Sequence, residues 1–288
     1  MNKQISFYLP DFYYKYDINL KLIRLLKEHK EWFNNFKIGA IYGSFPGAIW
    51  NGGRFVPGLT SMENIKATID IFNSYDVPIR FTFTNCLLEQ EHVYDTYCNM
   101  IMKIANNGMN EVLVNSPVLE LYLREKYPNF KYILSTTRCE RDVNKINEAC
   151  SLYHLVVPDF RDNHNKDFLN SLINKDKIEL LADEYCLPGC SLRSEHYLYH
   201  SKCQLNYLSS NNFNCPYHFD LLSDRWKNPT IIQPEELYTY YANMGFSNFK
   251  IVGRGMSSLD VIESYVKYLV KPEYKDEVRY QLLKEILK

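Results

Sequence analysis

Four closely spaced cysteines are the residues with the clearest capacity for chemistry. They are half of the chain's eight cysteines and lie within thirty residues: Cys186, Cys190, Cys203 and Cys215. The turn Pro188-Gly189 separates the first two, and the later intervals are long enough for a helix or loop to return the chain. Four thiolates that converge in this way suit a tetrahedral zinc ion or an iron–sulfur cluster. The alternative is that they are small core residues, since free cysteine is often buried and inert.

Histidines accompany the cysteines. His196 and His200 are four residues apart, so they would share one face of a helix. The pair could bind a metal, but Tyr197 follows His196, so the His-Glu-x-x-His order of zinc proteases is absent. We therefore predict four sulfur ligands, with the two histidines as their neighbours or as substrate contacts. His218, three residues after Cys215, is an alternative ligand.

The cysteine segment follows the seventh of eight predicted strands, which alternate with predicted helices. The strands are expected at residues 5–9, 36–42, 78–84, 110–114, 132–134, 152–157, 177–182 and 248–252. The helices are expected at residues 19–35, 62–75 after a Ser61 cap, 89–106, from Pro117, 142–150, 166–174, from Pro234, and from a Ser257 cap to 269. This alternation indicates a parallel sheet, and eight units predict a TIM-like (β/α)8 barrel.

Neither a G-x-G-x-x-G fingerprint after the first strand nor a Walker phosphate loop is present, which disfavours an open nucleotide-binding sheet. We therefore predict that residues 1–288 form one α/β barrel domain. The cysteines would lie in an insertion at about 184–232, after the seventh strand.

Polar residues follow the predicted strands, where a barrel of this kind has its active site. Arg254, between two glycines past the eighth strand, could hold an anionic group bidentately, or else pair with a neighbouring carboxylate. Arg54 lies in the long loop 43–59, where glycines let the backbone approach a ligand or simply form a turn. We predict Arg254 and Glu184 as catalytic residues. The predicted substrate contacts are Arg54, Tyr42, Asn85, Asn115, His196 and His200.

The composition limits the classes of function. A net charge of −1 gives no support to a general nucleic-acid-binding or membrane-binding surface. The N-terminal residues lack the apolar stretch of a signal peptide, and no apolar run approaches the roughly 20 residues that cross a bilayer. We therefore expect a cytoplasmic protein without a membrane span. In that reducing compartment, cysteines are ligands, reactive groups or core residues before they are disulfides.

Two segments resemble the peptidase U32 family, particularly its short members similar to ubiquinone-biosynthesis accessory proteins. They are residues 184–190, with the cysteines that follow, and residues 249–258, whose Lys-Ile-x-Gly-Arg match points to Arg254. The resemblance implies a TIM-like barrel, a [4Fe-4S] cluster on the four cysteines, and oxygen-independent hydroxylation. The G-x-x-C-x-x-x-x-G-x-C segment of peptidase-type members is absent, which weighs against proteolysis.

The leading hypothesis is an iron–sulfur barrel enzyme that performs hydroxylation or another redox reaction on a small-molecule or nucleotide-like substrate. A radical-SAM enzyme is disfavoured, because no C-x-x-x-C-x-x-C motif occurs. One alternative is a non-catalytic barrel with a structural zinc, acting as a scaffold or with a partner subunit. Another is a U32-type peptidase or hydrolase, whose activity would survive replacement of the four cysteines.

Overall fold

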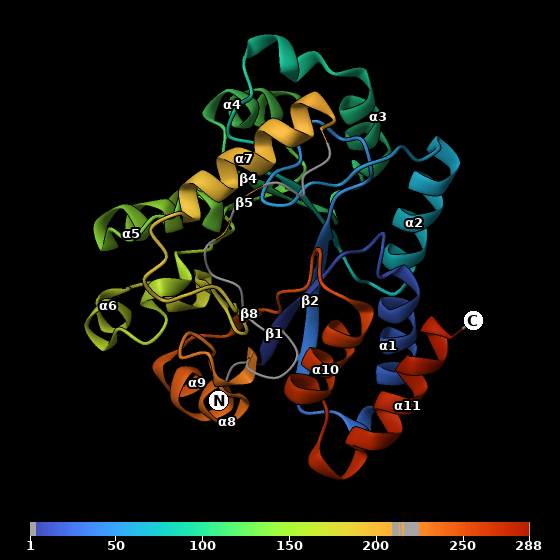
Figure 1. Cartoon of the computed structure of the whole chain (residues 1–288), viewed down its shortest axis with the longest axis vertical. Helices are drawn as coiled ribbons and strands as arrows, with labels where there is room; N and C mark the ends of the chain where they lie inside the picture. Colours follow the sequence, from blue (N-terminus) through green and yellow to red (C-terminus); the bar gives the residue numbers. More distant parts are fainter. Residues whose placement is uncertain (1–3, 209–212, 214, 216–224, 288) are drawn as a thin grey trace.

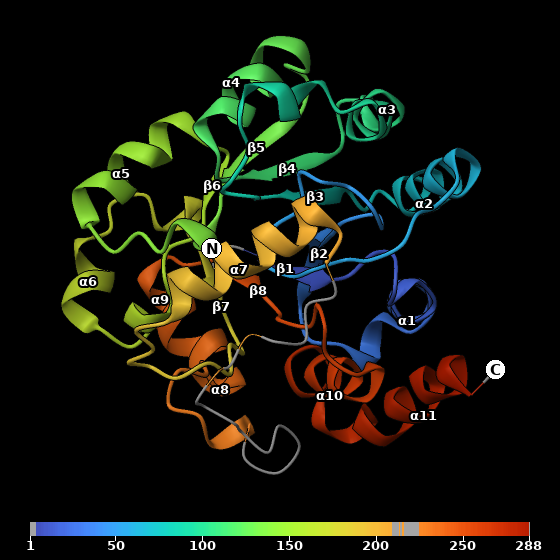
Figure 2. The ribbon, with the colours of Figure 1, turned by 45° about the horizontal axis from the view of Figure 1, so that its top comes forward.

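Eight parallel strands form one curved sheet surrounded by helices (Figures 1 and 2). The computed structural model describes residues 4–208, 213, 215 and 225–287. The strands are β1 (Ile5–Pro10), β2 (Phe36–Gly43), β3 (Ile79–Phe83), β4 (Glu111–Val114), β5 (Lys131–Leu134), β6 (Leu155–Val156), β7 (Glu179–Leu181) and β8 (Asn248–Lys250). Their order in the sheet is β6-β5-β4-β3-β2-β1-β8-β7, so β1 pairs with both β2 and β8.

The two edges of this sheet meet. Val156 of β6 forms a parallel bridge with Ile178, the residue before β7. This bridge closes the sheet into a ring and confirms the predicted TIM-like barrel, in which all strand ends of one polarity meet at one mouth.

Helices cover the outside of the barrel. They are α1 (Tyr16–Glu28), α2 (Met62–Ser74), α3 (Thr96–Ala105), α4 (Pro117–Lys126), α5 (Val143–Leu152), α6 (Lys166–Ser171), α7 (Arg193–Asn206), α8 (Pro234–Glu236), α9 (Ala242–Met244), α10 (Ser258–Leu269) and α11 (Lys275–Ile286). A π-helical turn, η7 (Leu237–Tyr241), joins α8 to α9 without interruption. The sequence analysis did not predict α11, which packs on α1 and α10.

Short polar signals set the helix boundaries. Ser61, Ser116 and Ser257 each accept a hydrogen bond from a backbone N–H in the first turn, and Pro117 occupies the first position of α4. Several predicted boundaries were wrong. The helix expected at 19–35 is α1, which begins at Tyr16 and ends at Glu28, and the helix expected at 166–174 ends at Ser171. The helix expected at 89–106 is divided because Asp95 caps α3, and the strand expected at 152–157 is short because α5 extends to Leu152.

Charged residues fill the middle of the barrel because side chains alternate along each strand. Arg80 of β3 is fully buried, and its Nε donates to Glu111 Oε2 of β4 at 2.7 Å. Its Nη1 donates to Glu179 of β7, and its guanidinium lies 3.9 Å from the centroid of the Tyr8 ring. Each charge in this group therefore has an opposite charge beside it, which offsets the cost of removing them from water.

Helix α7 crosses the barrel mouth from one side to the other (Figure 2). At its first turn, Arg193 lies 3.7 Å from Glu184, which follows β7. Toward its other end, Gln204 Oε1 accepts hydrogen bonds from Asn51 Nδ2 at 3.1 Å and from the Val56 amide at 2.9 Å. These hydrogen bonds attach α7 to the loop after β2, so α7 is held across the C-terminal ends of the strands.

Candidate active site

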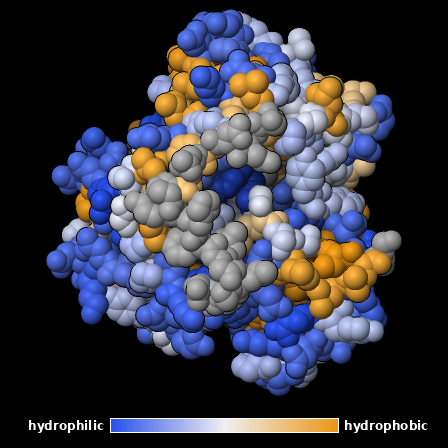
Figure 3. All heavy atoms as spheres, viewed as in Figure 1, coloured by the Kyte–Doolittle hydropathy of each residue, from blue (hydrophilic) through white to orange (hydrophobic). Residues whose placement is uncertain are grey.

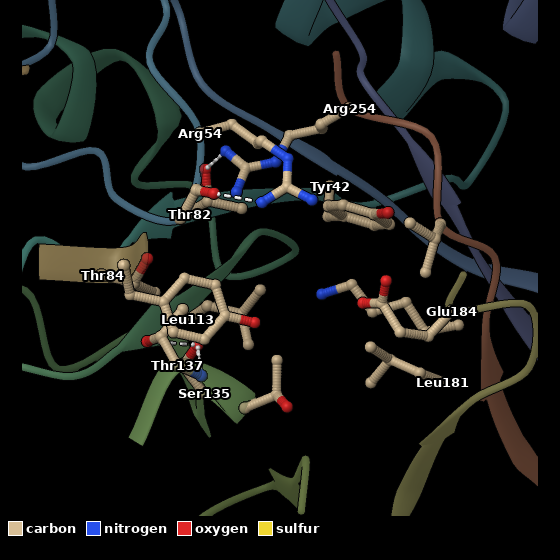
Figure 4. A pocket seen from close by; sticks show the side chains of 15 residues that line it. Tyr42, Arg54, Thr82, Thr84, Leu113, Ser135, Thr137, Leu181, Glu184 and Arg254 are labelled. Carbon is tan, nitrogen blue, oxygen red and sulfur yellow. Dashed lines mark hydrogen bonds between the residues drawn. The ribbon is translucent and has the colours of Figure 1, made fainter. Parts of the chain in front are cut away.

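A polar cavity of about 500 Å³ lies at the C-terminal end of the strands, beside α7. The face shown in Figure 3 is hollowed near its centre, and the surface in the hollow is hydrophilic. Its walls come from strand ends, the loop after β2, and α7 (Figure 4): Tyr42, Gly53, Arg54, Thr82, Thr84, Leu113, Ser135, Thr136, Thr137, Leu181, Glu184, Tyr197, Lys250, Val252 and Arg254.

Two arginines share one wall of this cavity (Figure 4). Arg254 Nη1 donates to Asn51 Oδ1 at 2.9 Å and to Thr82 Oγ1 at 2.7 Å, and its Nη2 donates to the Gly52 carbonyl at 2.9 Å. Arg54 donates to the Gly53 carbonyl at 2.7 Å. These acceptors are neutral oxygens, and no carboxylate lies within ion-pair distance of either guanidinium in the described part of the chain.

The environment of Arg254 is unfavourable to its charge. Burial lowers the pKa of the guanidinium to about 10, and the positive charge of Arg54 acts in the same direction. The ion pair considered for Arg254 in the sequence analysis therefore does not occur among the described residues. An anion in the cavity would supply the missing negative charge.

Lys250, the last residue of β8, also lines the cavity and was missed by the sequence analysis. Its ammonium lies 3.9 Å above the Tyr42 ring and 3.9 Å from Glu179 Oε1, an atom without a hydrogen bond among the described residues. Burial lowers the pKa of Lys250 to about 7, although the charge of Glu179 opposes the shift. A signal was available in the sequence: Phe249 and Ile251 mark the outward face, so Lys250 must point inward.

Hydroxyl groups form a neutral part of the cavity wall. They come from the ends of β3 and β5 and from α7: Thr82, Thr84, Ser135, Thr136, Thr137 and Tyr197. Ser135 Oγ accepts from the Thr137 amide at 3.2 Å and from Thr137 Oγ1 at 3.0 Å. Such groups can donate to or accept from a polar ligand without adding charge.

Glu184 faces the cavity across from Thr84 and Thr137 (Figure 4). Its Oε1 accepts hydrogen bonds from the amides of Tyr185 and Cys186 at 3.1 and 3.2 Å. Glu184 therefore shapes the turn that begins the cysteine segment, in addition to lining the cavity.

Three of the predicted substrate contacts are engaged within the protein. The Tyr42 hydroxyl donates to the Ile251 carbonyl at 2.7 Å, so Tyr42 lines the cavity with its aromatic ring. Asn85 is fully buried and donates to the carbonyls of Ile49 and Ser201, which joins the end of β3 to α7. Asn115 donates to Thr137 Oγ1 at 2.7 Å and thereby supports the hydroxyl wall. Neither asparagine lines the cavity itself.

The predicted histidine pair lies on one face of α7. The Nε2 atoms of His196 and His200 are 2.8 Å apart, and the His196 ring stacks on Phe213. Burial and the charge of Arg54 lower the pKa of His196 to about 4 and that of His200 to about 3. Both rings are therefore neutral near pH 7, the form that can bind a metal or share one proton.

A second cavity of about 550 Å³ adjoins the first and contains part of the cysteine group. Cys186 and Cys215 line it, together with His196. The Cys186 and Cys190 thiols interact, and burial with the neighbouring Glu184 charge raises the pKa of Cys186 to about 12. Arg54, Glu184 and Tyr197 belong to the walls of both cavities, so the cysteines lie beside the polar mouth.

Cys203 does not join this group. It lies ten residues after Arg193 within α7, about 15 Å along the helix axis from Arg193 at 1.5 Å per residue, and it does not line the second cavity. In the described part of the chain, no three metal-binding side chains come together in a geometry that could hold an ion. The four-thiolate set that the resemblance implies is not assembled among the described residues and stays a prediction, and His218 lies outside the described residues.

Fold and cavity together define a parallel α/β barrel with a cation-lined mouth. A solved structure of the U32 peptidase Mk0906 has this fold, with a TM-score of 0.56 over 88% of this chain and 94% of that chain. The identity is 10%, so the likeness is one of fold, and at that level it confirms the resemblance seen in the sequence. No family model matches the chain, and no curated protein matches it.

Across the described residues, no helix combines the length and the apolar character that crossing a membrane requires.

Proposed function

We propose that this protein is an enzyme that binds a small anionic substrate in the mouth cavity. The observation that carries the proposal is the pair Arg54 and Arg254, two cations on one wall whose hydrogen bonds go to neutral oxygens. For Arg254 burial outweighs the favourable charges nearby and lowers the pKa to about 10, so an anion bound at this wall would supply negative charge that the guanidinium lacks.

The arrangement suits a carboxylate or phosphate group. Guanidinium groups present paired N–H donors that match two oxygens of such an anion. The hydroxyls of Thr84 and Thr137 and the carboxylate of Glu184 lie around the same space and can orient the uncharged remainder of the substrate. A nucleotide-like substrate is compatible with this chemistry, since its phosphate would face the arginines.

The proposal is tested by anion binding. Thermal shift and calorimetry with phosphate and with small mono- and dicarboxylates should show saturable binding to the wild-type protein. Arg254→Met should weaken it about tenfold or more, which corresponds to the loss of one charge-assisted interaction of about 1.5–3 kcal/mol. Arg24→Met is the matched control, because Arg24 lies on the exposed surface against Tyr75. Equal binding by wild type and Arg254→Met would refute the proposal.

We propose a redox centre as the second candidate function. It is favoured by the contact between the Cys186 and Cys190 thiols and by Cys215 on the adjoining cavity wall. Cys186 and Cys190 could bind iron–sulfur or zinc if Cys215 moved toward them and a fourth ligand joined, and a cluster there would supply electron transfer. The [4Fe-4S] cluster and oxygen-independent hydroxylation stay hypotheses that the resemblance implies.

Metal and sulfide analysis of anaerobically purified protein tests this candidate. Cys186→Ala and Cys190→Ala should lose any bound iron or zinc, whereas Cys203→Ala should keep it because of its distance along α7. Iron with sulfide and visible absorption would support a redox role, and colourless zinc would support the structural alternative, a scaffold or a subunit of a complex. Retention of metal by all three variants would exclude this thiolate site.

The protein of similar fold is named as a peptidase, and peptide hydrolysis is therefore our third hypothesis for this chain. Hydrolysis of peptides by a variant lacking Cys186, Cys190 and Cys215 would favour it over the redox candidate.

A further inference from the structure

Lys250 is the one lysine on the wall of the mouth cavity among the residues described. It stands at the C-terminal end of β8, and its side chain is about 8% exposed, so its amine reaches the cavity while most of its stem is enclosed. Its ammonium lies 3.9 Å from the centroid of the Tyr42 ring and 3.9 Å from Glu179 Oε1. A primary amine held in this way is a potential nucleophile as well as a charge.

We propose that Lys250 is a nucleophilic amine that forms a Schiff base with the aldehyde or ketone group of a small anionic ligand. The nitrogen lone pair attacks the carbonyl carbon, and the carbonyl oxygen takes up a proton to give a carbinolamine. Loss of the hydroxyl as water then leaves a carbon–nitrogen double bond between ligand and Lys250. The step is a condensation, amine plus carbonyl giving imine plus water, and needs neither oxidant nor reductant.

The charges around Lys250 favour the neutral amine. Burial lowers the pKa to about 7, and the guanidinium groups of Arg80 and Arg254 act in the same direction. The carboxylates of Glu179 and Glu184 oppose them. With a pKa of 7 rather than its usual 10.5, about half of the amine is unprotonated at pH 7, roughly a thousandfold more than for an exposed lysine. Glu179 Oε1, which lacks a hydrogen bond among the described residues, is the nearest proton acceptor.

The same cavity supplies a place for the ligand's anionic group. Arg254 lines it with Lys250, so an anion on the arginines would hold its carbonyl group near the amine. The inference therefore rests on the proposed anion-binding function and specifies the reactive group of the substrate.

Reductive trapping tests the inference. The protein is incubated at pH 7 with glyoxylate, an anionic aldehyde, and cyanoborohydride, and the adduct is located by peptide mass spectrometry. We expect one predominant adduct, on the peptide that contains Lys250, and its loss in Lys250→Arg. Lys267→Arg is the matched control and should keep the adduct, because Lys267 is a half-buried lysine that lies against Trp226, away from the cavity.

Two further measurements keep the test decisive. The trapping rate of the wild type should rise to half its maximum near pH 7, whereas trapping at surface lysines should continue to rise toward pH 10. This readout does not depend on whether Lys250→Arg folds. Arg254→Met should slow trapping of glyoxylate more than trapping of uncharged propanal.

The outcomes separate the two proposals. Adducts spread evenly over surface lysines, with saturable binding of oxalate as an unreactive anion, would overturn the role of Lys250 and leave the anion site intact. Absence of oxalate binding would overturn the proposed function, whatever the trapping result. Trapping at Lys250 that follows a pH midpoint near 10 would also contradict the inference.

Discussion

Replacing Arg80 by methionine tests whether the charges inside the barrel stabilise it. Methionine keeps the length of the aliphatic stem but removes the guanidinium that donates to Glu111 and Glu179. The variant would leave Glu111 without this partner and would leave Glu179 with Lys250 as its nearby cation, at 3.9 Å.

The expected magnitude follows from the lost contacts. Each charge-assisted hydrogen bond contributes about 1.5–3 kcal/mol, and removing one member of a buried ion pair costs about 3–5 kcal/mol. Because Arg80 has two such bonds and is fully buried, we expect Arg80→Met to lower the free energy of unfolding by about 4 kcal/mol. With a urea m-value of about 3 kcal/mol per molar or more, the unfolding midpoint would fall by about 1 M.

Urea unfolding followed by far-UV circular dichroism measures this change. Arg24→Met, on the exposed surface, should stay within about 0.5 kcal/mol of wild type. Arg80→Met/Glu111→Gln should be more stable than Arg80→Met, because the double variant removes one uncompensated carboxylate. The reasoning is refuted if Arg80→Met remains within about 1 kcal/mol of wild type, a typical effect for an unremarkable substitution.

Three further predictions follow from single residues. Ser116→Ala should lower the free energy of unfolding, measured with urea, by about 1 kcal/mol, since it removes the acceptor for the Leu119 amide. Ser116→Asp should keep most of the wild-type stability, because aspartate can also accept this hydrogen bond. Gly52→Ala should reduce the melting temperature and weaken anion binding, because its Cβ would lie 2.4 Å from the Thr84 backbone; Gly189→Ala, with open space around it, should not change the melting temperature. Lys250→Met should be more stable than wild type at pH 7. The folded-state pKa of Lys250, about 7, lies below the unfolded value near 10.5, so the unfolded wild type binds more protons in that window and wild-type stability rises with pH. The advantage of the variant should therefore shrink by up to about 4 kcal/mol between pH 7 and pH 10.5, and a constant difference across that range would contradict the pKa assignment.

The barrel was predictable because its signals are local. Hydrophobic alternation marked the strands, and Ser61, Ser116 and Ser257 marked helix starts through hydrogen bonds that involve only the next few residues. The polar strand ends indicated where a cavity would form, and Arg54, Glu184 and Arg254 do line it.

The interior charges could have been predicted and were not. Arg80 stands between Ile79 and Phe81 in a predicted strand, so the alternation that identified the strand also placed the arginine inside the barrel. The same reasoning applies to Lys250, whose unusual environment depends on being enclosed rather than on its neighbours in sequence.

The positions of the four cysteines relative to one another could not be predicted from the sequence. Their spacings are compatible with a chain that returns to one centre, but α7 continues for fourteen residues and carries Cys203 away from Cys190. What fixes α7 is its contact with the loop after β2, through Gln204 and Asn51, which are 153 residues apart in sequence. No local pattern encodes a contact of that separation.

The single bridge between Val156 and Ile178 has a mechanical consequence. Neighbouring strands elsewhere in the ring share registers of two to six residue pairs, whereas this join has one. A ring with one weak join opens there first, so amide hydrogen exchange should be fastest along β6 and the start of β7. Leu181 of β7 forms part of the cavity wall, so transient separation of β6 from β7 would widen the mouth of the barrel from the side. A ligand could then enter the cavity without passing α7.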